Sequence, residues 1–464
     1  MAANLQKHAR YKAAYDPSGG LFWGIGIEEE TYLQTCRPIQ VATPIIRLCQ
    51  APERYSVDYA GTYDPLLLAM SLADHFPDKV GFVPLPYYLN SHALTAMDTA
   101  GQHRTTYAKV PKPNPDFSGK TIFEELQAHD PAVFKDGHEV IFTFDGDSIE
   151  FMTQRFYCAK VPGVVAELAE AKANFLKSLN RFVKARGLFK LYGGALTFAR
   201  GNPGFVIQTT NPSQVAMFNN GTYHFNITLP SYTDPVGSAA LPAGSAALPA
   251  LRHPAAFVAD HRRFIRLIQW LEPFVLAMYG SPDPFGLTKA SQRCAISRYI
   301  GIGTYDTSTM PEGKLLSQST TRIRGSEKPF WWYRRFHENS GYIPLKAIGM
   351  DINFRKHHNH GVEIRCLDWF PHKRLASLLR FFILLADLAL SRPLAPEAAL
   401  SETWNDVVVG VLKEGKSWPV SASIAATYER ILGIPITPGT AATLFNTVQD
   451  ALEHVTGQCS RLML

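Results

Sequence analysis

A chain of 464 residues can form a large core, either in two or three ordinary domains or in one enzyme built on a single large sheet. With 46% hydrophobic and 19% charged residues the composition is that of a soluble globular protein, and a net charge of +6 is too small to indicate nucleic-acid binding, although it suits an anionic substrate such as a nucleotide. The six cysteines include no CxxC pair, the N-terminus has no signal-like apolar core, and no apolar run reaches membrane-spanning length, so we expect a cytoplasmic protein with reduced thiols and no membrane or nucleic-acid partner.

The first half of the chain contains patterns typical of strands, followed by one long helix. The residue patterns predict a strand at 21–34, a helix at 64–76, a proline-rich loop at 108–118, a hairpin formed by 138–144 and 148–154 around an Asp-Gly turn, and a helix at 163–187 with Gly187 at its C-terminal cap.

The rest of the chain, from residue 189 on, contains strands and helices without strict alternation. Strands are predicted at 189–199, 221–230 and 361–369, and helices at 255–280, 372–391, 403–415, 421–433 and 439–455. The heptapeptide GSAALPA occurs twice in tandem within 235–250, which indicates a low-complexity loop because two short copies cannot build a repeat fold. The lack of regular βαβ alternation favours an α+β protein with a mixed or antiparallel sheet.

Three consecutive glutamates end the first predicted strand, in the segment FWGIGIEEETYLQ. Because side chains alternate between the two faces of a strand, Glu28 and Glu30 share one face and Glu29 takes the other. Two carboxylates about 7 Å apart on one face repel each other, so they need a cation or a proton nearby unless the strand end lies in water. We therefore expect Glu29 to tolerate substitution far better than its two neighbours.

The same spacing recurs in three other strand-like segments. His224 and Asn226 share a face in YHFNITLP, Glu363 and Arg365 share a face in GVEIRCLDW, and Glu150 interrupts the apolar run SIEFM. One such case is typical of a solvent-exposed face, but four together predict one polar sheet face that forms a cavity. In the same segments, Cys366 is predicted to be buried rather than nucleophilic, and Asp368 to orient an arginine or a turn.

This set of residue types fits hard cations and phosphate. Carboxylate and amide oxygens without thiolates favour Mg²⁺ or Mn²⁺ over zinc, and the planar guanidinium of Arg365 fits a phosphate. Cations and arginines around a polyphosphate are typical of phosphoryl transfer. The sequence has no Walker A motif and no GxGxxG loop, so ATP would be held on the sheet face through metal ions.

These motifs resemble those of the glutamate–cysteine ligases and the broader carboxylate–amine ligases of the glutamine synthetase-like superfamily. GIEEETYL resembles their G-I-E-x-E-T strand, SIEFMT their E-F-[IM]-T segment, GTYHFNITLP their H-x-N strand, and GVEIRCLDWFP their E-x-R-x-L-D strand, in the same order. The resemblance covers about 22–34 and 145–370. It does not reproduce the usual acidic residue seven positions before Glu150, where Thr143 stands.

The resemblance implies a fold and a reaction. The fold is a curved, mainly antiparallel sheet that forms a funnel-shaped active site with helices packed outside. The reaction is an ATP-dependent ligation: the γ-phosphate activates an amino-acid carboxylate, for instance a glutamate-like γ-carboxylate, as an acyl phosphate, and an amine then forms an amide with release of ADP and phosphate. The implied cofactors are ATP and Mg²⁺ or Mn²⁺, and the partners are small amino-acid and amine substrates, whose identities the motifs leave open.

The resemblance also assigns roles to residues by position. The implied metal ligands are Glu28, Glu30, Glu150 and Glu363, and His224 is implied as a metal ligand or a phosphate contact in the cofactor site. Asn226 is the neighbour of His224 in the cofactor site, and Arg365 contacts the transferred phosphoryl group. Either Arg293 or Arg298 is implied as a second residue that binds a phosphate or carboxylate group, and Arg355 is a further candidate for binding the nucleotide.

Two alternatives and a domain organisation accompany this hypothesis. The alternatives are a phosphotransferase of the guanidino kinase type on the same fold and a non-catalytic nucleotide-binding relative. We expect one catalytic domain over 1–395, with an insertion at about 35–135 and the loop at 235–250. Residues 396–464 are expected to be a helical extension packed on the same domain.

Overall fold

The computed structural model describes most of the strands and helices expected around the predicted site. The described residues are 20–31, 33–34, 88–89, 126, 128–136, 139–140, 142–145, 148–198, 206–209, 216–219, 221–233, 251–280, 289–291, 352–354, 361–398 and 401–464. The expected helix at 64–76, the loops at 108–118 and 235–250, and the candidate arginines Arg293, Arg298 and Arg355 lie outside these ranges.

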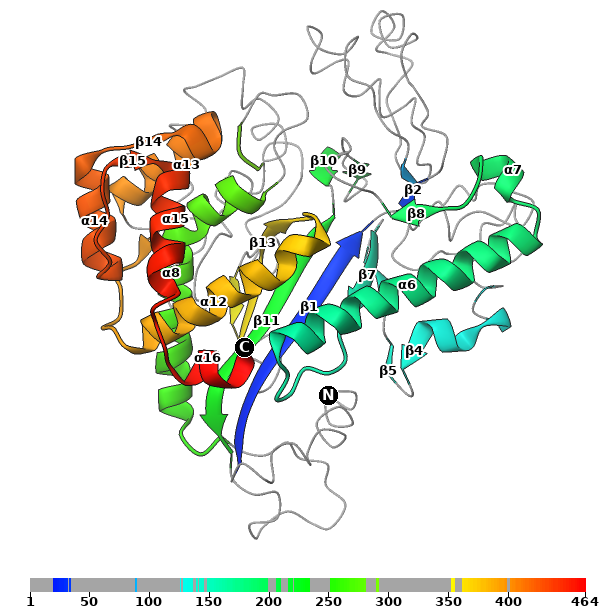
Figure 1. The fold of residues 1–464 in the computed structure, drawn as a ribbon, viewed down its shortest axis with the longest axis horizontal. Coiled ribbons are helices and arrows are strands. Elements are labelled where there is room, and N and C mark those ends of the chain that lie inside the picture. The colour runs from blue at the N-terminus through cyan, green and yellow to red at the C-terminus, as the bar shows by residue number, and fades with distance from the viewer. Residues whose placement is uncertain are drawn as a thin grey trace, which may run out of the picture.

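The secondary structure of the described residues mixes strands and helices (Figure 1). The strands are β1 (Leu21–Thr31), β2 (Leu33–Gln34), β3 (Tyr88–Leu89), β4 (Lys135–Asp136), β5 (Glu139–Val140), β6 (Phe142–Asp145), β7 (Ser148–Met152), β8 (Thr197–Phe198), β9 (Val206–Thr209), β10 (Ala216–Asn219), β11 (Thr222–Tyr232), β12 (Ile352–Phe354), β13 (Val362–Asp368), β14 (Pro419–Val420) and β15 (Gly439–Thr440). The α-helices are α6 (Val161–Ala185), α7 (Phe189–Tyr192), α8 (Pro254–Tyr279), α12 (Leu375–Leu390), α13 (Glu402–Glu414), α14 (Ala422–Leu432), α15 (Ala441–Leu452) and α16 (Gln458–Met463).

A six-stranded sheet lies at the centre, in the order β12-β13-β11-β1-β7-β6, and every neighbouring pair is antiparallel. The two long strands β1 and β11 run side by side through its middle (Figure 1). The expected α+β class with an antiparallel sheet is therefore confirmed.

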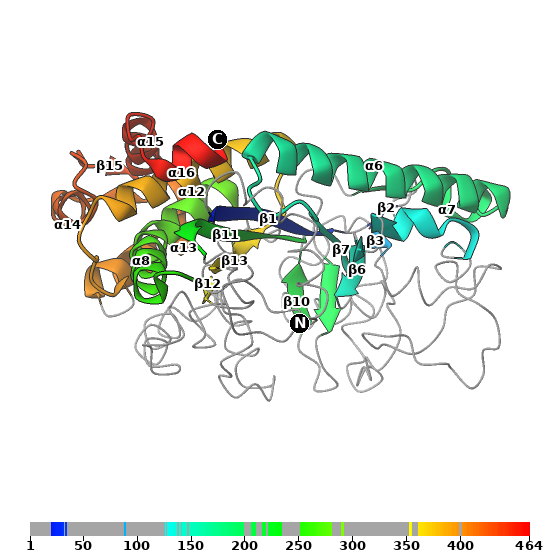
Figure 2. The same cartoon turned by 90° about the horizontal axis from the view of Figure 1, so that it is seen from below.

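Helices cover one face of this sheet. Figure 2 shows α6 and α12 lying across it, and α8 packs against β11 and β13. The alternating residues Ile25 and Ile27 of β1 and Phe225 and Ile227 of β11 are fully buried in the core that these helices share with the sheet. The period-2 pattern of the strands thus directs one set of side chains into the core and the other set to the opposite face.

The opposite face of β1 changes character along the strand. A side chain at Gly24 or Gly26 would collide with the Phe156 ring, whose atoms lie 2.0 and 2.9 Å from the ideal Cβ positions. The glycines therefore let Phe156 cover this part of the face, where it packs with Phe22 and Tyr157. Beyond the glycines the same face carries the glutamates, so the acidic part of β1 is confined to one end of the strand.

Some predicted elements differ from the structure. The strand expected at 189–199 is wrong: its first part is the short helix α7, and only Thr197–Phe198 is strand. Gly193 and Gly194 have φ values of +75° and +144°, which interrupt an extended chain. The strand expected at 21–34 ends at Thr31, and Leu33–Gln34 pairs instead with β3 and β8. Gly187 follows α6 with φ +73°, as its predicted cap role requires.

The C-terminal helices attach to α8 and α12. Trp404 Nε1 donates to the Gln269 carbonyl at 2.8 Å, and the Tyr428 hydroxyl donates to the Trp270 carbonyl at 2.9 Å. Asp387 of α12 accepts hydrogen bonds from the backbone N–H groups of Cys459 and Ser460, each at 2.8 Å, at the start of α16. Within the described residues, no helix combines the length and apolarity needed to cross a bilayer.

Asp387→Ala is expected to lower the free energy of unfolding by about 2 kcal/mol, because two backbone donors at the start of α16 lose their acceptor in a buried place. Asp387→Asn keeps one acceptor oxygen, so its loss should be intermediate. Urea unfolding followed by circular dichroism measures both variants, with exposed Asp450→Ala on α15 as the control. A loss as small as that of the control would contradict the capping role.

Candidate functional site

The face of the sheet that points away from α6 brings the predicted residues of β1 and β11 together. In the antiparallel register Glu28 lies directly opposite His224, and Gly26 lies opposite Asn226. Directly opposed residues of neighbouring strands project from the same face. Because Glu29 faces the helices, Glu28 and Glu30 share the other face with His224 and Asn226, as the alternation predicts.

His224 is the centre of this group. Its Nδ1 atom lies 3.3 Å from Glu28 Oε2 and 3.8 Å from Glu363 Oε1, and its Nε2 atom lies 3.6 Å from Glu30 Oε1. Asn226 Nδ2 donates a hydrogen bond to Glu28 Oε1 at 3.0 Å. One imidazole is therefore surrounded by carboxylates from β1 and β13, and the Glu28 carboxylate is oriented from two sides.

Glu150 joins the group from the other neighbour of β1. On β7 it lies directly opposite Glu30. Glu28, Glu150 and His224 can each offer one ligand atom within 4.8 Å of one another. Across the next strand pair, Thr143 of β6 lies opposite Glu150, so the position at which the ligase motif has an acid is also adjacent to this group.

The electrostatics of this face favour a cation. Glu30 is 8% exposed and Glu363 1% exposed, so both carboxylates are largely removed from water. Buried carboxylates that converge on one point repel one another, and an imidazole supplies at most one positive charge. A set of carboxylate oxygens with one imidazole nitrogen and no thiolate fits Mg²⁺ or Mn²⁺.

A bulge in β13 shapes the other side of the group. Between the pairs Tyr223↔Leu367 and Phe225↔Ile364, two residues of β13, Arg365 and Cys366, lie opposite His224 alone. Cys366 points into the core and is 1% exposed, as expected, whereas Arg365 is partly exposed. The extra residue places Asp368 opposite Thr222.

The polar face also contains contacts that the sequence motifs did not single out. Thr222 Oγ1 lies 3.3 Å from His224 Nε2, and the Ser291 hydroxyl donates to Asp368. Thr222 could have been found from the sequence, because it precedes His224 by two positions and so shares its face. Ser291 could not, because it lies outside the sheet and far from β13 in the chain.

Glu29 corrects one expectation. It is fully buried on the helix side of the sheet, forms an ion pair with Lys172 of α6, and accepts a hydrogen bond from Trp369 Nε1 at 2.8 Å. The alternation placed it correctly, but its burial and its ion pair contradict the expectation that it tolerates substitution. Removing one partner of a buried ion pair leaves the other charge unpaired, which is strongly destabilising.

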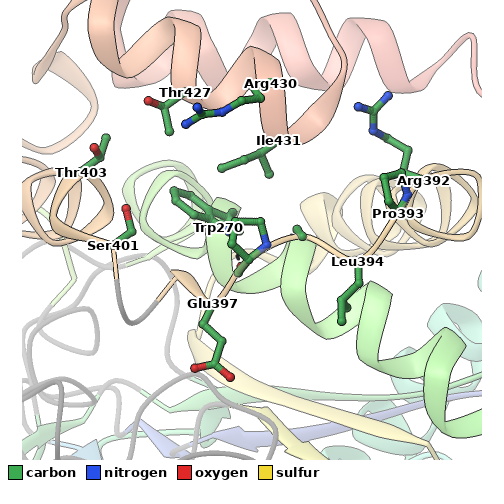
Figure 3. Close-up of a pocket in the computed structure, with 12 residues that line it drawn as sticks. Trp270, Arg392, Pro393, Leu394, Glu397, Ser401, Thr403, Thr427, Arg430 and Ile431 are labelled. Carbon is green, nitrogen blue, oxygen red and sulfur yellow. Dashed lines mark hydrogen bonds between the residues drawn. The ribbon is translucent and has the colours of Figure 1, made fainter.

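A pocket of about 630 Å³ lies elsewhere, between α8, the segment after α12, and helices α13 and α14 (Figure 3). Trp270 and Ile431 line it together with Arg430 and Thr427. It shares no residue with the polar face, and its one lining carboxylate, Glu397, already pairs with Arg266. The polar face is therefore the candidate functional site.

The fold and this group define an α+β protein whose antiparallel sheet carries a set of candidate metal ligands on one face. No family model matches the chain. The uncharacterized protein R704 of Acanthamoeba polyphaga mimivirus is 35% identical to it over 434 residues, which cover 92% of this chain and 73% of the mimivirus protein. The chain belongs to the same family as this mimivirus protein.

Proposed function

We propose that the protein is an ATP-dependent carboxylate–amine ligase of the glutamate–cysteine ligase type. It would convert an amino-acid carboxylate, such as a glutamate-like γ-carboxylate, into an acyl phosphate and join it to an amine, with release of ADP and phosphate. The observation that carries the proposal is the convergence of four carboxylates from three strands, those of Glu28, Glu30, Glu150 and Glu363, on His224 of a fourth strand in the same antiparallel sheet.

Glu28, Glu150 and His224 are the residues best placed to hold a divalent cation, since their ligand atoms already lie within 4.8 Å of one another. Glu30 and Glu363 border the same place through their contacts with His224. Mg²⁺ or Mn²⁺ bound there would neutralise phosphate charge on ATP, which is the main requirement of phosphoryl transfer.

The neighbouring side chains would orient the candidate metal ligands and bind the phosphoryl group. Asn226 of β11 donates its amide hydrogen bond to one oxygen of the Glu28 carboxylate and so fixes the orientation of that carboxylate. Arg365 lies beside His224 at the bulge and would bind the transferred phosphoryl group through its planar guanidinium. Arg293 or Arg298 as a second clamp, and Arg355 as a nucleotide contact, remain part of the proposal but lie outside the described residues.

The shape of β1 supports a funnel closed at one end. Phe156 covers the face at Gly24 and Gly26, so the reacting groups would meet only at the end that carries Glu28 and Glu30. A closed apolar end next to a charged end would exclude water from one side of the acyl phosphate and limit its hydrolysis.

The test is product analysis after incubation with Mg-ATP and pooled amino acids and amines. A ligase releases ADP only when both a carboxylate and an amine are present, and mass spectrometry detects the new amide. A phosphorylated product without an amide would replace the proposal by the phosphotransferase alternative. The absence of any ATP turnover with either metal would favour a non-catalytic nucleotide-binding relative.

A further inference from the structure

The buried ion pair between Glu29 and Lys172, on the helix side of β1, is not explained by stability alone. Glu29 is 0% exposed, yet its Oε2 atom has no hydrogen-bond partner among the described residues. A partly satisfied buried polar cluster is commonly less stabilising than apolar side chains of similar volume.

The position of the ion pair relates it to the cation site. Glu29 lies between Glu28 and Glu30 and projects from the opposite face of the same strand. Its Oε1 atom contacts Lys172 on α6 and Trp369 at the end of β13. The Trp369 backbone N–H in turn donates to the Gly221 carbonyl, next to β11, at 2.8 Å. The Glu29 carboxylate thus connects β1 to α6 and, through Trp369, to the ends of the two strands that carry His224 and Glu363.

The strand needs such a connection because its acidic face is under repulsion. Without a cation, the carboxylates around His224 repel each other and tend to rotate or shift β1 away from β11. A shift by one residue would turn Glu28 and Glu30 toward the apolar helices and Glu29 toward the site. Fixing register and orientation is the best-attested use of a buried ionic group.

We propose that Glu29 and Lys172, together with Trp369, are positioning residues that hold Glu28 and Glu30 in place for the cation. This inference depends on the proposed function, because it assigns a role toward the same cation site. Lys172 suits this role because its side chain is only 13% exposed, and because its ammonium group lies 4.9 Å from the centre of the Phe198 ring, which limits its movement.

The experiment measures Mn²⁺ binding by electron paramagnetic resonance in the full chain, at a temperature where circular dichroism shows each variant folded. Glu29→Gln keeps an acceptor for Trp369 and removes only the charge, and Lys172→Met removes the partner charge while keeping the length of the side chain. Each should weaken Mn²⁺ binding about tenfold, the lower end of the effect of residues that orient metal ligands. The double variant should lose no more than either single variant, because both disrupt the same pair.

The controls separate positioning from general damage. Lys172→Arg retains the charge and should bind Mn²⁺ within about threefold of the parent protein, a small fraction of the loss expected when an orienting contact is removed. Lys177→Met changes an exposed lysine on the same helix and should have no effect.

Folded Glu29→Gln or Lys172→Met protein with unchanged Mn²⁺ affinity would overturn the positioning role, even with a lower melting temperature. Failure of the parent protein to bind Mn²⁺ would instead overturn the cation site, and with it this role. If Glu29→Gln does not fold, the contrast between Lys172→Arg and Lys172→Met decides the question.

Discussion

Glu363→Gln is expected to lower magnesium-dependent ATP turnover by about a hundredfold or more, because it removes one charge from the group that would hold the cation. Glu363 is 1% exposed, lies opposite Asn226 in the sheet, and has its Oε1 atom 3.8 Å from His224 Nδ1. Glutamine has nearly the same shape, so the substitution changes the charge without opening a cavity. A coupled assay that monitors ADP release measures the effect.

The stability of the same variant distinguishes a functional loss from a structural one. In metal-free protein Glu363→Gln removes a repulsion among buried carboxylates, so its melting temperature should equal or exceed that of the parent. Glu170→Gln, on the exposed side of α6, is the matched control and should change neither quantity. Undiminished turnover in Glu363→Gln would show that Glu363 is not part of the cation site. A parallel fall in turnover and melting temperature would attribute the loss to folding.

His261 is expected to make the fold sensitive to acid. Complete burial lowers the pKa of its imidazole to about 4, although a hydrogen bond to the Phe257 carbonyl opposes the shift. Its Nδ1 lies 2.7 Å from that carbonyl, and its Nε2 accepts the Leu229 N–H at 3.0 Å. A neutral imidazole with the proton on Nδ1 satisfies both contacts and connects α8 to β11. Protonation of Nε2 would destroy the second contact.

The pH dependence follows from this lowered pKa. The unfolded chain takes up a proton near the ordinary imidazole pKa of 6.5 and the folded protein only near about 4, so stability from His261 is complete above pH 6.5 and is lost as the pH falls toward 4. The difference corresponds to about 3 kcal/mol. Urea unfolding at pH 7.5 and at pH 4.5 measures the acid loss, that is, the fall in the free energy of unfolding between the two pH values. This acid loss should be smaller in His261→Gln than in the parent protein, by most of these ~3 kcal/mol.

A histidine at the start of α8 provides the control for this measurement. His253 precedes the helix and is exposed, so His253→Gln should keep the full acid loss of the parent. The comparison between variants removes the contribution that all other groups make in common. An equal acid loss in His261→Gln and the parent would show that His261 is not the group responsible.

Sequence patterns predicted the elements whose signals are local. The strand expected at 221–230 is β11, the strand expected at 361–369 is β13, and the helix expected at 163–187 is α6, each within a few residues of its bounds. The segment 189–199 failed because its apolar residues suggested a strand, whereas Gly193 and Gly194 adopt positive φ values that divide it. Apolar runs of this length do not distinguish a strand from a short helix.

The candidate site was predictable to the extent that it follows from alternation. Glu28 with Glu30, and His224 with Asn226, share faces because side chains in any strand alternate, and the structure places both pairs on one face. The neighbourhood of Glu29 was not predictable. Its partners Lys172 and Trp369 are 143 and 340 residues away in the chain, and no local pattern indicates a buried ion pair at such separations.

The sequence by itself determined which side chains of each strand lie together, because that depends only on the local backbone period. The tertiary structure alone decided which strands meet and in which register: it placed Glu28 opposite His224, 196 residues later, and inserted the bulge that turns Asp368 toward Thr222. It also decided that Glu29 is buried rather than solvated. These outcomes depend on the packing of distant segments, which compete for burial and for hydrogen-bond partners over the whole chain and not within any one stretch of it.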